Sequence, residues 1–193
     1  MTSWPPLVSF CCNKGSTGGK DTDNNVRKSQ GFTVNIISEP FVENANVTSV
    51  DAPADFNEWS ISGLTKAPSV PWLRLSPSNI LAHHAHVSQV YVKAPRVKES
   101  AFSMECELYQ AIDITHPTTG ECTSTLVLAH VKYIHVRNDM LTERETVDPT
   151  KFKPVARMGD TSYARVGDAF RIPRPVWATE EGSIQEVMQR LLN

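Results

Sequence analysis

The chain has 193 residues, with 19 Lys and Arg against 21 Asp and Glu, and a formal net charge of −2. This length suits one domain, and the near balance of charge leaves no basic excess for a nucleic acid backbone. No apolar run reaches the roughly 18 residues of a membrane span, so neither nucleic acid nor a membrane is an expected partner. The four Cys form no disulfide framework and the first ten residues lack the basic start of a signal peptide, so we expect a reducing, cytoplasmic location.

Two apolar segments near the N-terminus predict strands. Residues 7–12 (LVSFCC) form a short apolar run typical of a buried strand. Residues 32–37 (FTVNII) are rich in β-branched side chains, which favour a strand. The composition of residues 39–67 is mixed, and we expect short helices among loops there.

A glycine-bearing loop separates these strands and leads into a predicted helix. Residues 13–19 are polar, and Asp21 or Thr22 is suited to cap a helix that runs through Lys28 and stops at Gly31. Backbone N–H groups at a helix start, together with an ammonium and hydroxyls, suit an anion such as a phosphate. A plain turn is the alternative for a short glycine-rich loop, so the loop alone does not decide between them.

A long hairpin is the clearest structural pattern. Residues 104–114 alternate, which predicts a strand with Glu105, Glu107 and Asp113 on one face. The other face is predicted to hold Met104, Cys106, Leu108, Ile112 and Ile114. After a turn at 116–121, residues 123–136 are apolar at nearly every position and predict a strand covered on both faces.

The C-terminal part combines loops with a terminal helix. Residues 137–175 carry Pro and Gly at short intervals, which indicates loops with short elements. A helix capped near Thr179 would place five apolar side chains on one face: Ile184, Val187, Met188, Leu191 and Leu192. Because strands rarely alternate with helices here, we expect a mainly β protein, a small antiparallel barrel or sandwich with peripheral helices.

Histidines and cysteines offer few readable sites. His83, His84 and His86 form a cluster that could ligate a metal, but no further Cys or His lies at ligand spacing nearby, so an exposed loop is the favoured interpretation and we predict no metal site. Cys11 and Cys12 are adjacent, so their side chains should point to opposite faces of a strand.

Cys106 is expected in the core. His130 and His135 are five residues apart and are expected on opposite faces of their strand; His130 is either a proton donor near a cofactor or an ordinary sheet histidine. No signature of a Ser-His-Asp or Cys-His nucleophile is present.

A series of blocks, in order, resembles the flavin reductase-like family of FMN-binding split barrels. The blocks are KDT (20–22), FTVNIIS (32–38), NVTS (46–49), DFNEWSISGLT (55–65), KAPRVKES (93–100), MECEL (104–108), VDP (147–149), PVARMGDTSYAR (154–165) and RIPRP (171–175). The resemblance implies a Greek-key antiparallel split barrel over residues 1–175, followed by an amphipathic helix at 176–193. It also implies a homodimer that binds FMN, takes hydride from NAD(P)H, and passes reduced flavin to a partner oxygenase or another acceptor.

The same resemblance assigns candidate flavin-binding residues block by block. The strand end and loop near the flavin supply Ser9, Cys12 and Asn13, and the block near the phosphate or ribityl chain supplies Lys20, Asp21 and Thr22. The late block that lines the flavin pocket supplies Arg157, Gly159 and Tyr163. A surface ion pair is the alternative role for Arg157. The flavin would carry the redox chemistry, so no protein nucleophile is needed.

Two features depart from the family pattern. Family members carry further strands ahead of the segment that LVSFCC resembles, so we expect this chain to lack them, as a truncated sequence or a degenerate paralogue. Residues 70–89 interrupt a stretch where the family runs nearly straight, and joining Ser69 to Val90 restores its spacing. A retained intron or a surface insertion would explain this segment. The rival functions are a module that holds FMN without turnover and a dimerising fragment that binds nothing.

Overall fold

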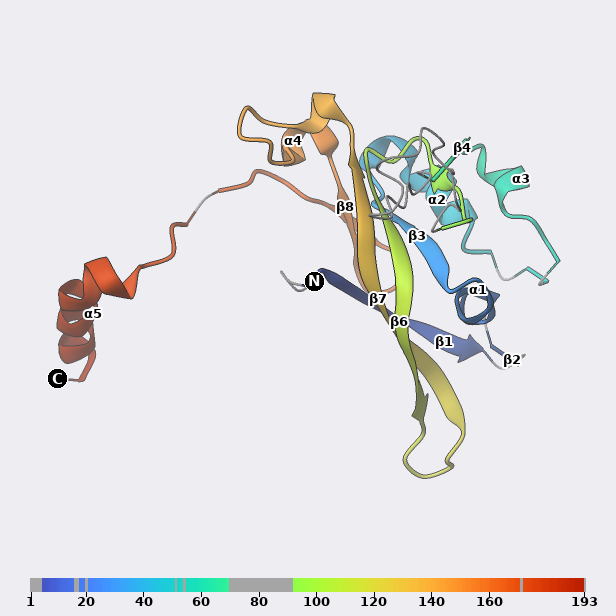
Figure 1. Ribbon diagram of the computed structural model, residues 1–193, viewed down its shortest axis with the longest axis horizontal. Helices are drawn as coiled ribbons and strands as arrows, with labels where there is room; N and C mark the ends of the chain where they lie inside the picture. The colour runs from blue at the N-terminus through green and yellow to red at the C-terminus, as the bar shows by residue number, and fades with distance from the viewer. Residues whose placement is uncertain are drawn as a thin grey trace, which may run out of the picture.

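The protein is built on one antiparallel sheet, seen in a computed structural model (Figure 1). The structure describes residues 5–15, 18–19, 21–50, 52–53, 55–69, 92–170 and 172–192. In the order of the sheet, its strands are β2 (Gly18–Gly19), β1 (Leu7–Gly15), β7 (Cys122–Val136), β6 (Phe102–Thr115) and β3 (Gly31–Asn35). The sheet curls strongly, because the rings of Phe10 on β1 and Phe32 on β3 lie 5.4 Å apart although two strands separate β1 from β3.

Two short ribbons and a set of short helices surround this sheet. The ribbons pair β4 (Lys66–Ala67) with β5 (Arg96–Val97) and β8 (Val155–Arg157) with β9 (Tyr163–Arg165). The helices are α1 (Asp21–Ser29), η1 (Glu39–Phe41), α2 (Val42–Val47), α3 (Trp59–Ser62), η3 (Asn138–Met140), α4 (Pro149–Phe152) and α5 (Trp177–Leu192). The mainly β class with peripheral helices is confirmed. Of the helices in the described part of the chain, none combines the length and apolarity needed to span a bilayer.

The predicted N-terminal elements form, with shifted ends. The strand from Leu7 extends to Gly15 and pairs with β2, so the expected loop is shorter than predicted. Asp21 and Thr22 lie inside the first turn of α1 rather than before it. The helix ends at Ser29. The next residue, Gln30, has the left-handed backbone conformation (φ 58°) that a glycine usually adopts after a helix end. Gly31 is instead the first residue of β3.

The core lies between α1 and the inner face of the sheet. Cys12, Val26 of α1 and Val127 form one buried cluster, and a neighbouring cluster contains Cys106. The core position of Cys106 is confirmed, as are the opposite directions of the Cys11 and Cys12 side chains, the first exposed and the second buried. Burial raises the pKa of the Cys106 thiol to about 12, so this group stays protonated.

The predicted single apolar face of the long strand β6 is wrong beyond Leu108. Leu108 pairs with Ala129 and Gln110 with Leu128, so Tyr109 is an extra residue, a β-bulge. One extra residue reverses which side chains face the core. Asp113 therefore points to the α1 side, where it contacts Arg27.

On the same stretch, Ile112 and Ile114 point to the side away from α1, and Ile114 is exposed. The prediction that the partner strand β7 is covered on both faces holds only in part. Residues 125, 127, 129 and 131 are buried, whereas Tyr133 and Ile134 are exposed. The sheet therefore has a packed inner face and an outer face that is partly bare.

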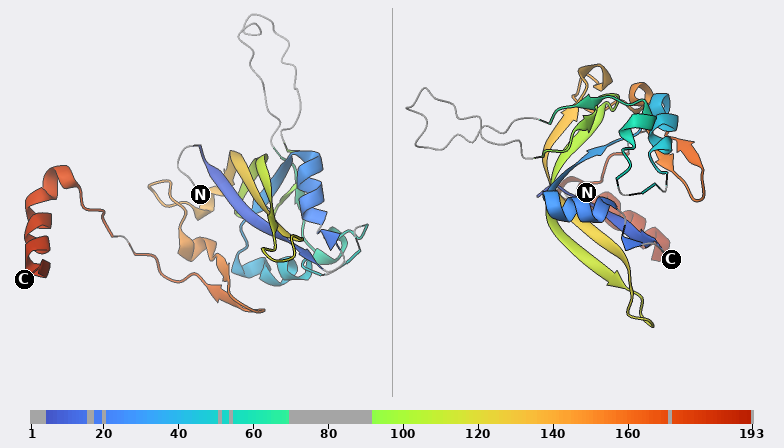
Figure 2. Two further views of the ribbon diagram at one scale, coloured as in Figure 1. Left: turned by 90° about the horizontal axis from the view of Figure 1, so that it is seen from below. Right: turned by 90° about the vertical axis from the view of Figure 1, so that its right-hand side faces the viewer.

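The C-terminal segment leaves the body of the protein. Short elements among loops at 137–175 are confirmed by η3, α4, β8 and β9. The terminal helix α5 begins at Trp177, two residues before the expected position, and it stands apart from the sheet at the end of an extended segment (Figure 2).

Residues 70–89, including His83, His84 and His86, lie outside the described residues, which resume at Val92. The flanks of this segment are close together. The Ser69 hydroxyl donates to the Ala94 carbonyl at 2.8 Å, and β4 pairs with β5 just beyond. Such closed ends are what an inserted loop requires.

Candidate functional site

The strand-to-helix corner between β1 and α1 is the centre of the candidate site. Strand β1 is held against β7, and the paired glycines of β1 and β2 turn the chain toward Asp21. The first backbone N–H groups of a helix have no partner within the helix, so this corner presents donors. Lys20 lies outside the described residues.

A buried polar network fixes α1 in place. The Asp23 carboxylate accepts from Arg27 Nε at 2.8 Å. The Thr125 hydroxyl lies 3.2 Å from Asp23 and 2.9 Å from Asp113, so the two carboxylates share its one proton. The Thr125 hydroxyl, followed by the charge of Arg27, holds the pKa of Asp113 below its usual value. The start of α1 is therefore set by the sheet rather than by the loop before it.

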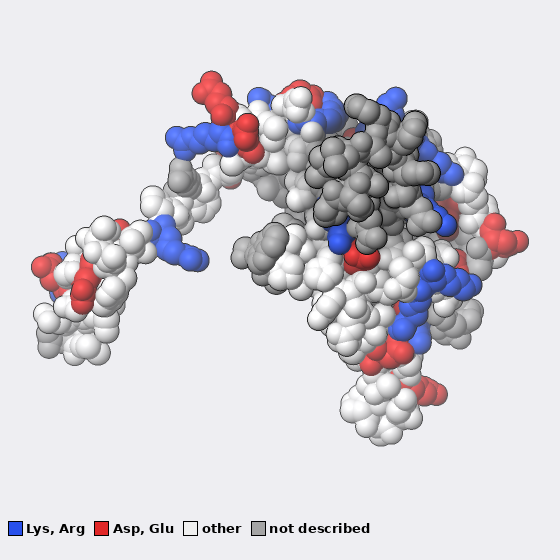
Figure 3. All heavy atoms as spheres, viewed as in Figure 1, with Lys and Arg blue, Asp and Glu red and all other residues white. Residues whose placement is uncertain are grey.

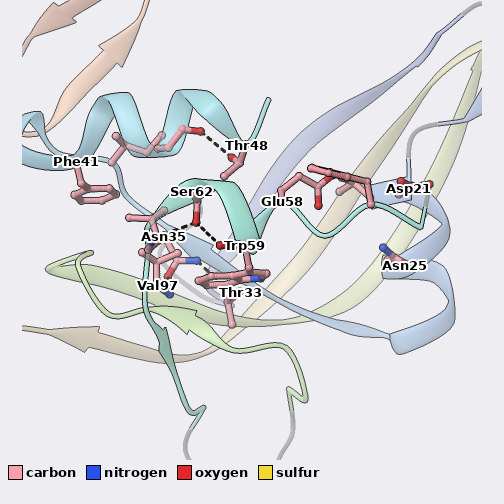
Figure 4. Close-up of a pocket in the computed structure, with 15 residues that line it drawn as sticks. Asp21, Asn25, Thr33, Asn35, Phe41, Thr48, Glu58, Trp59, Ser62 and Val97 are labelled. Carbon is pink, nitrogen blue, oxygen red and sulfur yellow. Dashed lines mark hydrogen bonds between the residues drawn. The ribbon is translucent and has the colours of Figure 1, made fainter. Parts of the chain in front are cut away.

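Two cavities border the N-terminal turn of α1, and the larger one opens directly beside it. It has a volume of about 610 Å³, within the range of small-molecule sites. Figure 4 shows Asp21 and Asn25 of α1 at one end and Asn35, Trp59 and Phe41 toward the other. Its walls are Asp21, Thr22, Asn25, Thr33, Asn35, Ile37, Phe41, Ala45, Thr48, Phe56, Glu58, Trp59, Ser62, Leu64 and Val97.

The chemistry of these walls fits a ligand with a flat ring and hydroxyl groups. Aromatic side chains stack on a ring, and the hydroxyls and amides bond a polar chain. No Lys or Arg is among the described wall residues, and Asp21 and Glu58 carry negative charge. A phosphate would therefore depend on the N–H groups of α1 and on Lys20.

A second cavity lies between β1 and β3, which the curl of the sheet brings close together. Its volume is about 510 Å³, and β1 contributes Ser9 while α1 contributes Thr22. The other walls are mainly apolar: Val8, Phe10, Val26, Phe32, Thr33, Val34 and Asn35. Thr22 thus borders both cavities, and the structure brings Ser9 and Thr22 to one of them.

The three candidate residues of β1 do not share a face. Ser9 and Asn13 are exposed on the outer face, opposite Leu128 and Ser124 of β7. Cys12 points to the inner face and is buried against Val26. A direct contact between the Cys12 side chain and a ligand on the outer face would need a rearrangement of this core.

The late block forms the β8–β9 hairpin. The guanidinium of Arg157 lies 4.7 Å from the centre of the Tyr163 ring and donates to the Asp160 carbonyl at 2.8 Å. The Tyr163 hydroxyl donates to Asn46 of α2 at 3.0 Å, and α2 also supplies walls of the larger cavity. Gly159 has open space around it. The structure joins Arg157 and Tyr163 and ties them to α2, not to the start of α1.

The expectation that the two histidines of β7 face opposite sides is wrong. His130 is opposite Glu107, while His135 Nε2 lies 2.7 Å from Glu105 Oε1. Glu105 and Glu107 are two residues apart on a regular part of β6, so their side chains point to the same face of the sheet. Both histidines therefore lie on that face. The cause is an extra residue of β7 at the step between Glu105 and Cys106.

The environments of the two histidines still differ. His130 is half-buried, packs edge to face against Tyr109 with ring centres 4.9 Å apart, and shares the outer face with Ser9. His135 is committed to Glu105, whose side chain is almost completely buried. His130 is therefore the one of the two that a ligand on the outer face can approach.

Sequence reasoning did not single out several cavity walls. Asn35, Phe41 and Trp59 come from β3, η1 and α3, which are distant in the chain. Trp59 and Ser62 lie in the DFNEWSISGLT block, which carried the resemblance without a role being given to any residue. The available signal was Trp59 itself, an aromatic residue that lies between acidic residues and serines in a short helix.

The charge pattern gives no further site. In the part of the chain that the structure describes, no group of three His, Cys, Asp or Glu side chains is placed to hold a metal. Acidic and basic side chains are interspersed over the face in Figure 3. This mixture disfavours a strongly charged partner on that face.

Comparison with known proteins agrees with this fold. The solved structure of nitrilotriacetate monooxygenase component B from Bacillus cereus has a TM-score of 0.72 at 26% identity, covering 89% of this chain and 74% of that one. A split-barrel protein of Shewanella frigidimarina has a TM-score of 0.66 at 18% identity, covering 91% and 74%. An uncharacterized protein of Aquifex aeolicus is 29% identical over 163 residues, or 83% of this chain and 68% of its own length.

The curled antiparallel sheet with peripheral helices is therefore a split barrel of the flavin reductase type. The family model described as the flavin reductase like domain matches residues 1–155. The chain belongs to this family, and its function is related to flavin oxidoreduction.

Proposed function

We propose that this chain binds FMN at the β1–α1 corner and transfers hydride from NAD(P)H to it. The observation that supports this most directly is the place of Thr22, which lies in the first turn of α1 and borders both cavities. The N–H groups of that turn and Lys20 would hold the phosphate, while Ser9 and Asn13 would approach the flavin from β1.

Bound FMN supplies hydride and electron chemistry that no amino-acid side chain offers. The task of the protein is then to bind, orient and shield the flavin. The network of Asp23, Arg27 and Thr125 keeps α1 oriented, and the aromatic cavity walls exclude water. His130, at the outer face beside Tyr109, would be the nearest candidate for holding a proton. Asp21 would tune the phosphate end, since its carboxylate opposes a second negative charge.

The assembly that we propose is a homodimer in the cytoplasm. All four cysteines are free, which suits a reducing compartment where NAD(P)H is abundant. The late hairpin with Arg157, Gly159 and Tyr163 would then border the flavin of the neighbouring copy, because it does not reach α1 of its own chain. A partner oxygenase is the proposed acceptor of reduced flavin, since the related Bacillus cereus protein is a monooxygenase component.

Titration of the full chain with FMN tests binding, with quenching of flavin fluorescence as the readout. We expect a single saturable site. Thr22→Val should weaken binding about tenfold, the effect of one hydrogen bond to a charged group, whereas the same change at Thr118 in the exposed β6–β7 turn should not. A full chain that leaves free FMN unquenched would refute the site and favour a dimerising fragment without cofactor.

A module that holds FMN without turnover is the second candidate. It is favoured by the absence of Lys and Arg from the described walls of the larger cavity, which leaves little to attract the phosphates of NAD(P)H. Rapid anaerobic mixing of the FMN-loaded chain with NADH and NADPH separates the two. Bleaching of the visible flavin band supports the reductase, and a stable yellow colour with both nucleotides supports the module.

A further inference from the structure

The C-terminal arm, residues 166–192, exposes nearly all of its apolar side chains. Among its described residues, Ile184 is half-buried and all the others are exposed. Leu191 and Leu192 are more than 80% exposed, and Phe170 is 84% exposed. The remaining large apolar side chains of the arm are exposed too: Ile172, Val176, Trp177, Val187 and Met188.

The connection to the body disfavours a fold back onto the same chain. Pro173 and Pro175 stiffen the segment before α5 into an extended spacer. Figure 1 and the left view of Figure 2 show the arm running away from the sheet. The family model matches residues 1–155, so its match ends before this arm begins.

By itself α5 is a marginal helix. It has 16 residues, just above the length of about 12 to 15 below which isolated helices are marginal in water even when they are rich in alanine. Gly182 in its interior lowers helix stability further by roughly 1 kcal/mol relative to alanine. A stripe formed by Trp177, Ile184, Val187, Met188 and Leu191 follows the helical period, so a partner that covers this stripe would stabilise the helix.

The same chain carries an apolar surface without such a cover. We define the outer patch as Cys11, Ile112, Ile114, Leu126 and Leu128, which share one face by register. The bulge at Tyr109 creates this patch by turning the two isoleucines away from α1. Cys11 and Ile114 are exposed.

We propose that the arm is exchanged in a homodimer, with α5 of each copy packed on the outer patch of the other. One chain holds both complementary surfaces, and a reciprocal exchange with two-fold symmetry covers both. The apolar side chains of one arm expose on the order of 1,000 Å², against roughly 800 Å² per partner in a standard interface.

This inference rests on the homodimer of the proposed function but not on flavin. Its consequence for the site follows from register. Ser9 and Asn13 flank Cys11 on the same face of β1, so the arm of the second copy would lie beside the proposed flavin and shield it from water.

The first experiment measures the mass of the full chain by light scattering across a dilution series. We expect Met188→Glu/Leu191→Glu to weaken dimerisation at least about 30-fold, as for the loss of two central interface side chains. The control Gln185→Glu/Gln189→Glu adds the same charge off the stripe and should keep the dimer. Circular dichroism of both variants reports whether the body remains folded.

The second experiment locates the contact by disulfide cross-linking. Leu191→Cys, treated with a mild oxidant, should form a disulfide with Cys11 of another copy and give a species of twice the chain mass. The band should disappear with Cys11→Ser, and Gln189→Cys should not form it.

The outcomes separate the two proposals. A monomeric wild-type chain would overturn both the homodimer and the exchanged arm. A dimer that survives Met188→Glu/Leu191→Glu overturns only the arm, as would a Leu191→Cys cross-link that forms within one chain. A dimer without bound FMN would leave the arm standing and remove the flavin site.

Discussion

The helices α1 and α5 are both amphipathic, but their surroundings are opposite. In α1, Val26 and Asp23 are buried against the sheet, and Arg27 bridges to β6. In α5 no residue is buried, and its ion pair between Arg190 and Glu186 is long and exposed. An apolar stripe therefore indicates that a helix needs a partner, but it does not say whether the partner is in the same chain.

The difference arises from what each helix can reach. The short turn through β2 leaves α1 directly over the inner face of the sheet. There, Thr125 and Asp113 are the polar partners of α1. The two prolines before α5 hold it away from any such surface. Two predictions test this contrast and two test other parts of the fold, in order of decreasing effect.

Asp23→Ala should have the largest effect on stability. It removes a buried carboxylate that accepts from Arg27 and Thr125; both side chains keep Asp113 as a partner, so the loss is that of hydrogen bonds to a charged group, about 1.5 to 3 kcal/mol. Glu186→Ala on α5 is the control and should change the free energy of unfolding by only a few tenths of a kcal/mol. Urea unfolding monitored by circular dichroism measures both. Equal losses would remove the distinction between an anchored and a free helix.

Thiol labelling should distinguish the two faces of the sheet. Cys106 should stay unlabelled in the folded chain, because its thiol is buried and its pKa is about 12. Cys11 should be slow to react in the dimer and at least about tenfold faster in Met188→Glu/Leu191→Glu, where the arm is released. Mass spectrometry after timed alkylation gives the rates. Fast labelling of Cys106 would show that the core cluster opens.

Deletion of residues 70–89 should have a small effect. Because Ser69 and Ala94 are already bonded across the base of this segment, joining Ser69 to Val90 closes the chain without moving β4 or β5. The midpoint of thermal unfolding should stay within a few degrees of the full chain, an amount that corresponds to about 1 kcal/mol or less. A deletion that fails to fold would show that the segment is part of the body. Transcripts that are spliced and still encode it would reject the intron.

The smallest effect concerns the N-cap of α4. The hydroxyl and the amide of Thr150 donate to Asp148 and lower the pKa of this carboxyl. A lowered folded-state pKa adds stability above the unfolded pKa, and this stability is lost as pH falls through the folded value. Asp148→Asn keeps a capping oxygen and should flatten part of the acid loss in melts from about pH 7 to pH 3. An unchanged acid profile would mean that the cap does not contribute.

The strands and helices were largely readable from the sequence, since each follows from local residue types. Period two marked β6, and apolar runs marked β1 and β7. The two β-bulges, at Tyr109 of β6 and on β7 near Glu105, could not be predicted from the sequence. A bulge requires no particular residue type and does not interrupt the alternation of apolar and polar residues. The larger cavity escaped notice because Asn35, Phe41 and Trp59 meet only when β3, η1 and α3 pack together.

By itself, the sequence determined that this is a mainly β chain with a glycine loop leading into α1 and an apolar stripe on α5, because hydrophobic period and backbone preference act over a few residues. Only the tertiary structure decided that Asp113 faces Arg27 while Ile112 and Ile114 face outward. The direction of a side chain depends on strand register, which one bulge shifts for every residue beyond it.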